Sequence, residues 1–127
     1  MRKRMDATKN ILRWVALLGL CGLGLLYLNS TVFSLWAVGG PPTEVPKAWL
    51  HRALVHFGFT VALFATAIFA FEALKPGFSF KGKKILYVWF VIVAVAICYP
   101  PIKKFISIDA CLDSGGKWSE KHFDCQK

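Results

Sequence analysis

Charged residues are scarce in this sequence, and acidic residues are the scarcest of them. Of its 127 residues only 18% are charged, with 16 Lys and Arg against 7 Asp and Glu, whereas 56% are hydrophobic and the mean hydropathy is +0.50. Soluble domains of this size rarely carry so much apolar sequence, so we expect the lipid bilayer to be its solvent. The net charge of +9 does not indicate a nucleic-acid partner, because the basic residues flank apolar runs and form no basic face with interleaved aromatics. Anionic membrane lipid is the expected counter-charge.

The sequence also lacks the motifs of known catalysts. It contains no Walker loop, no nucleophile elbow, no HExxH and no carboxylate pair suited to acid–base work. His51 and His56 are about 140° apart around a helix and cannot share one iron, and the other apolar runs contain no His. A zinc site of Cys111, His122 and Cys125 lacks a fourth ligand at the usual spacing. We therefore expect no enzyme activity, no cofactor and no metal.

Three apolar runs are long enough to cross a membrane. The second is uncharged between Arg52 and Glu72, a length that matches the ~20 residues needed to cross a hydrocarbon core of ~30 Å. The first is too long for a signal peptide and has no clear cleavage site, so we interpret it as an uncleaved span. The chain is predicted to be a single integral membrane domain with these segments: cytoplasmic amino-terminus 1–13, first span 14–38, periplasmic turn 39–48, second span 49–74, cytoplasmic loop 75–84, third span 85–102 and periplasmic tail 103–127.

The distribution of basic residues predicts the orientation. A basic cluster precedes the first span and another lies between the second and third spans, so the positive-inside rule places both in the cytoplasm. Lys103 and Lys104, which follow the third span, run against this rule. The predicted location is a bacterial inner membrane, with the carboxyl-terminus in the periplasm.

Two features of the spans stay open at this point. The first span is either one long tilted helix or a helix that ends near Asn29, with the residues up to Val38 in the interface. We favour the long helix, because Trp36 would then lie in the aromatic belt. Pro46 is assigned to the turn before the second span, and Pro100 and Pro101 are expected to break or kink the third.

The second span carries a stripe of small and polar residues. Helical spacing places the following residues on one face, which we expect to pack against the other spans or a partner: His51, Gly58, Ala62, Ala65 and Glu72. His56 lies deeper and is the candidate for a buried polar contact. Each of these two roles has a competing interpretation. Glu72 could simply anchor the helix in the interface, and His56 could simply pack against the other spans.

Cys111 and Cys125 bracket a short tail segment with a Gly-Gly turn and the apolar pair Trp118 and Phe123. So small a segment cannot fold by burial alone, and a disulfide closing it would contribute ~3 kcal/mol. Such a bridge needs an oxidising compartment, in agreement with a periplasmic tail. The predicted fold is an all-α membrane protein of three transmembrane helices with a short, disulfide-closed, extramembrane C-terminal hairpin.

This tail also carries a resemblance to known proteins. Cys111-Leu112-Asp113, Gly115-Gly116, Trp118 and the closing Cys125 form a pattern that resembles the periplasmic tail of small three-span proteobacterial inner-membrane proteins, some of which resemble immunity proteins. The resemblance implies a protein that protects against a membrane-active bacteriocin or secreted effector by binding it within the bilayer. The expected contacts are Gly58, Ala62 and Ala65 between helices, His56 as a polar contact, and Trp118 and Phe123 as an outer recognition surface.

Two other functions stay open. The first is a small accessory subunit of a larger inner-membrane complex, which would bind another membrane protein permanently. The second is a small oligomeric channel or holin-like protein built from several copies of the chain. Transport within one chain is poorly supported, because the sequence has no internal repeat and no acidic residue in the middle of a span.

Overall fold

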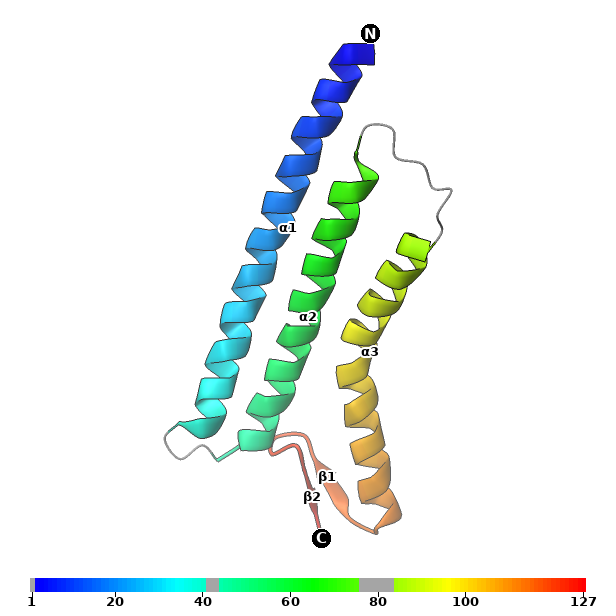
Figure 1. The fold of residues 1–127 in the computed structure, drawn as a ribbon. Coiled ribbons are helices and arrows are strands. Elements are labelled where there is room, and N and C mark those ends of the chain that lie inside the picture. The colour runs from blue at the N-terminus through cyan, green and yellow to red at the C-terminus, as the bar shows by residue number, and fades with distance from the viewer. Residues whose placement is uncertain (1, 41–43, 76–83) are drawn as a thin grey trace.

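The computed structural model describes residues 2–40, 44–75 and 84–127. It contains three long helices, α1 (Arg2–Gly39), α2 (Pro46–Ala73) and α3 (Lys84–Asp113), followed by two short strands, β1 (Lys117–Ser119) and β2 (Asp124–Gln126) (Figure 1). All three helices are long and apolar enough to cross a membrane. The predicted fold class is confirmed, although Pro41, Pro42 and most of the loop predicted at 75–84 lie outside the described residues.

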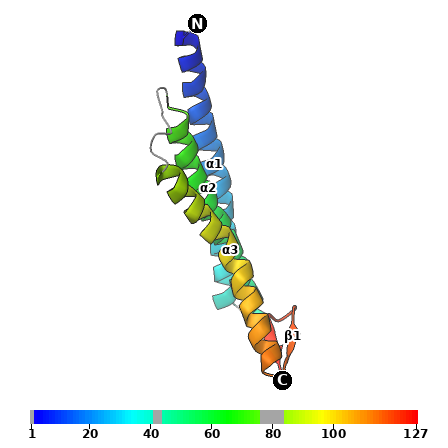
Figure 2. The ribbon, with the colours of Figure 1, turned by 90° about the vertical axis from the view of Figure 1, so that its right-hand side faces the viewer.

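The three helices lie side by side in a single layer, with α2 in the middle (Figures 1 and 2). The amino-terminus lies at one end of the layer, and the β1–β2 hairpin lies at the other, which we call the hairpin end. A single layer encloses little interior, so among the described residues few side chains are buried. Most of these are small, and they include Thr31, Ser34, Ala37, Ala53, Thr60, Ala62 and Ala67.

The helices are longer than the apolar runs that predict them. α1 begins at Arg2 and continues through Asn29 without a break, which is the long-helix interpretation of the first span. Pro46 is not part of the turn as expected but occupies the first turn of α2, where its missing N–H costs nothing because that group has no helical partner.

α3 also continues through its two prolines, so the expected break is absent. Pro100 and Pro101 lie inside a helix that extends to Asp113, and the first part of the predicted tail is therefore helical. Proline removes one helical hydrogen bond and tends to kink a helix, and α3 is visibly bent in Figure 1. Pro100 is buried, so packing against α2 supports the helix at this point.

A Schellman motif ends α3 and positions the hairpin. Gly115 has a φ of 74°, which glycine tolerates, and its N–H donates to the carbonyl of Leu112 at 2.9 Å. The N–H of Gly116 donates to the carbonyl of Cys111 at 3.0 Å. The strands then pair antiparallel, and the predicted disulfide joins Cys111 to Cys125 with a Cα–Cα distance of 5.5 Å.

Candidate functional site

The predicted stripe on α2 faces α3 and contacts it through backbone. A Cβ atom built on Gly58 would overlap the carbonyl oxygen of Ala96 and lie 3.2 Å from its carbonyl carbon. Pro100, four residues after Ala96, has no N–H to donate to that carbonyl, so the carbonyl lacks its helical hydrogen bond. The glycine thus lets α2 approach α3 closely at a carbonyl that is left without its helical donor.

The other stripe residues are also used mainly within the chain. Ala62 is buried, and Ala65 lines an apolar recess between α2 and α3. The His51 ring stacks on the Phe123 ring of the hairpin, with ring centroids 4.7 Å apart. Glu72 is half-buried and has no ion-pair partner among the residues whose placement is described. Internal packing therefore covers most of the α2 face that was predicted to contact either the other spans or a partner.

His56 lies on a different face of α2 and contacts α1. Its Nδ1 is 2.7 Å from the hydroxyl oxygen of Ser30, and the Tyr27 ring meets its ring edge-on with centroids 5.8 Å apart. Neighbouring hydroxyls bond within their own helices, such as that of Thr60, which donates to the carbonyl of His56. The Ser30–His56 pair is thus a polar contact between two apolar helices, where it favours one register.

A second stripe, on α1, is exposed in the structure. It consists of four exposed residues spaced by seven, which we call the free face of α1: Val15, Gly22, Asn29 and Trp36. A Cβ atom on Gly22 would meet nothing within 4 Å. The Asn29 side chain has no hydrogen-bond partner within the described ranges, although it lies well inside a span. The arrangement combines a small residue and an uncompensated amide on an otherwise apolar surface.

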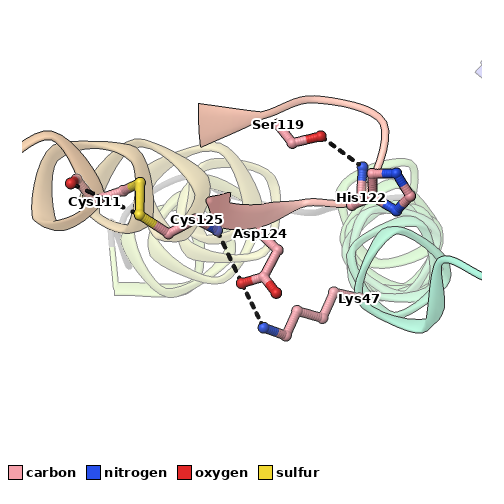
Figure 3. Close-up of polar contacts among 6 residues, drawn as sticks. All are labelled: Lys47, Cys111, Ser119, His122, Asp124 and Cys125. Carbon is pink, nitrogen blue, oxygen red and sulfur yellow. Dashed lines mark hydrogen bonds and ion pairs between the residues drawn. A yellow bond between two sulfur atoms is a disulfide. The ribbon is translucent and has the colours of Figure 1, made fainter. Parts of the chain in front are cut away.

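The hairpin is tied to α2 and α3 by ion pairs. The Lys47 ammonium at the start of α2 is 2.6 Å from Asp124, and the Lys104 ammonium on α3 is 2.9 Å from Glu120. Figure 3 shows the hairpin reaching from the disulfide on α3 to Lys47 on α2. The hydrogen bond from Lys47, with a smaller effect from the backbone N–H of Cys125, holds the pKa of Asp124 below its ordinary value.

Both aromatic residues predicted for outer recognition lie in this hairpin. Phe123 has a positive φ of 50°, stacks on His51, and meets the Trp118 ring edge-on with centroids 6.1 Å apart. The Trp118 ring is half-buried, and its Nε1 is buried without a hydrogen-bond partner in the described chain. The pair fixes the hairpin against the helices, which leaves only part of its surface for another molecule.

Sequence reasoning missed the contacts between distant positions. Ser30 and His56 are 26 residues apart, and Lys47 and Asp124 are 77 apart. No local spacing signals either pair. The seven-residue spacing of the free face of α1 was visible in the sequence, and only the structure shows that neither α2 nor α3 covers it.

Comparisons with known proteins add no relative. Neither the scan against protein-family models nor the searches of curated proteins and solved structures found a match.

Proposed function

We propose that this protein binds a transmembrane helix of another membrane protein within the bilayer, and that the free face of α1 is the contact surface. The observation that carries the proposal is Asn29, whose amide lies inside a span and has no hydrogen-bond partner among residues 2–40, 44–75 and 84–127. Water cannot satisfy an amide in the hydrocarbon, so a hydrogen bond from another helix stabilises it.

The geometry of this face limits what the partner presents. Gly22 allows a second helix to approach closely, which favours a small residue opposite it. Asn29 lies two turns further along and both donates and accepts, so the partner carries a hydrogen-bonding side chain at the matching depth. Val15 and Trp36, each more than 60% exposed, extend the contact toward both ends of the span.

Two identities fit a protein of this kind. An immunity protein would capture the apolar helix of a bacteriocin or secreted effector before it forms a pore, as the resemblance of the tail implies. An accessory subunit would keep the face covered permanently, and the length of the free face favours this second identity. Both identities require the amino-terminus in the cytoplasm and the hairpin in the periplasm. The disulfide supports that orientation, because it needs an oxidising compartment.

Site-specific photocrosslinking in living cells tests the proposal. A benzoylphenylalanine at Phe33, which is 55% exposed on α1 beside Asn29, should crosslink to one discrete membrane protein. The same residue at Phe57, 51% exposed on α2, is the matched control and should not. Asn29→Leu should reduce the Phe33 crosslink severalfold, and Asn29→Gln should retain it.

The identity of the crosslinked protein distinguishes an accessory subunit from an immunity protein. A stoichiometric subunit of a resident complex supports the accessory function, whereas a product formed only when a toxin is co-expressed, together with protection of the cells, supports immunity. A product that contains two copies of this chain would support self-association instead. If Phe33 crosslinks no more than Phe57, or Asn29→Leu changes nothing, the free face of α1 is not a docking surface.

A further inference from the structure

A recess of about 280 Å³ opens at the hairpin end between α2, α3 and the hairpin. Lysines line it from both helices, namely Lys47, Lys103 and Lys104. Lys47 and Lys104 form the ion pairs with Asp124 and Glu120, while Lys103 has no ion-pair partner in the part of the chain that is described. Three ammonium groups against two carboxylates leave the recess with excess positive charge.

One residue in the wall of this recess carries an unsatisfied donor. Trp118 lines it, and the indole Nε1 is buried with no hydrogen-bond partner among the described atoms. An indole nitrogen can only donate, and buried polar groups in folded proteins nearly always have a partner. The excess positive charge of the recess favours an anionic ligand, and the unpaired indole in its wall could donate to an acceptor oxygen of that ligand.

The recess continues into an apolar groove. Leu54 lines both the recess and a groove of about 470 Å³ that runs along the α2–α3 interface past Phe57 and Val61. α3 supplies the opposite wall with Val91 and Val95. From Leu54 to Val61 the groove is lined almost entirely by apolar side chains. With the recess, which begins at Lys47, it extends for roughly 21 Å at 1.5 Å per residue of α2. This length matches one leaflet with its headgroups, about half of a bilayer of ~40–45 Å.

We propose that this groove binds a phospholipid with an anionic headgroup, drawn from the leaflet at the hairpin end. The phosphate accepts hydrogen bonds from Lys103 and from Nε1 of Trp118, and one acyl chain lies along Leu54 and Val95. Both charge and shape complement such a lipid. The basic recess would hold the headgroup, and the apolar groove that continues from it would hold the acyl chain. The proposal is independent of any partner at α1.

Lipid titration of the purified full chain in a neutral detergent tests this inference. Native mass spectrometry should show one palmitoyl-oleoyl phosphatidylglycerol retained per chain, and the lipid should raise the melting temperature. Lys103→Gln should weaken binding about fivefold, the effect of one basic residue near an anionic headgroup. Trp118→Phe, which keeps the ring and removes the donor, should also weaken it. Lys121→Gln, exposed on the hairpin outside the recess, is the matched control and should bind as the parent does.

Binding to the unaltered chain decides the outcome even where a variant fails to fold. Phosphatidylcholine with the same acyl chains should bind several times more weakly, and equal binding would show that headgroup charge is irrelevant. Glycerol phosphate should not compete, and competition at the same concentration as the lipid would show a simple anion site. Val95→Phe, which fills the groove, should lower affinity, whereas Ile102→Phe, which lines none of these cavities, should not. Equal loss in both variants, or in neither, would contradict an acyl chain in the groove.

Discussion

Replacing Gly58 with Ala adds one methyl group where α2 lies against the backbone of α3. The new Cβ would overlap the carbonyl oxygen of Ala96, and the Cγ of Pro100 at 3.8 Å bounds the same space. Because the obstructing atom belongs to the backbone of a helix, no side-chain rotation relieves the overlap. α3 must move away from α2, or the helix must distort.

A matched substitution isolates the energy of this contact. Gly→Ala within a helix raises helix propensity by ~1 kcal/mol, and overpacking costs ~1–3 kcal/mol. Gly22→Ala has the same gain in propensity, and its Cβ meets nothing within 4 Å. The propensity term cancels between the two variants, so we expect Gly58→Ala to be less stable than Gly22→Ala by about 1–3 kcal/mol.

Unfolding by SDS in mild detergent micelles measures this difference. Near-UV circular dichroism reports the α2–α3 interface through the stacked rings of Phe69 and Trp89, whose centroids are 4.8 Å apart. Gly58→Ala should unfold at a lower SDS fraction than the parent chain, and Gly22→Ala at an equal or higher one. Equal midpoints for the two variants would refute a close backbone contact at Gly58.

Three further predictions concern the polar contacts. Ser30→Ala removes the hydroxyl that bonds to His56 and should lower the free energy of unfolding by ~0.6 kcal/mol, the average for such bonds between membrane helices; Ser107→Ala, whose hydroxyl bonds only within α3, should change it less. Reduction of the disulfide should accelerate trypsin cleavage in the hairpin while far-UV circular dichroism of the helices stays constant, and unchanged cleavage would show that the bridge does not order the hairpin. The Asp124 carboxylate has a depressed pKa, so its ion pair with Lys47 is fully formed above the ordinary carboxyl pKa of 3.8 and is lost as the pH falls through the lower folded value. Carbon NMR of that carboxyl should show its titration midpoint rise in Lys47→Gln, and an unmoved midpoint would contradict the ion pair.

The sequence predicts those parts of the fold that depend on local pattern. Long uncharged runs require helices in a bilayer, because every backbone polar group must then bond within its own segment. The disulfide could also be predicted from the sequence, because Cys111 and Cys125 bracket a segment too short to fold by burial alone. The sequence predicts a small-residue stripe on α2, but whether α3 or a partner covers it depends on tertiary packing.

The prolines show where local rules fail. Pro46 is predicted in the turn before the second span, and Pro100 and Pro101 are predicted to break or kink the third; in the structure Pro46 lies in the first turn of α2, and the other two lie within α3, which is bent (Figure 1). At Pro46 the first turn has no helical bond to lose. At Pro100 the lost bond leaves the Ala96 carbonyl free, and Gly58 on another helix packs against it. That contact comes from a residue some forty positions away, which no window of sequence around Pro100 reveals.

The positions of aromatic residues indicate how deep Gly58 and the Ala96 carbonyl lie in the bilayer. On α1, Trp14 and Trp36 are separated by roughly 33 Å at 1.5 Å per residue, close to a hydrocarbon core of ~30 Å.

α2 repeats the same interval from Trp49 to Phe71, and the two levels coincide because Trp14 contacts Phe71 and Phe33 contacts Trp49. Gly58 then lies roughly 13 Å below the level of Trp49, near the middle of the bilayer. An unbonded carbonyl is most costly there, because neither water nor headgroups can reach it. The glycine contact therefore does more than fill space: it covers an unbonded carbonyl of α3 at the depth where lipid offers no donor.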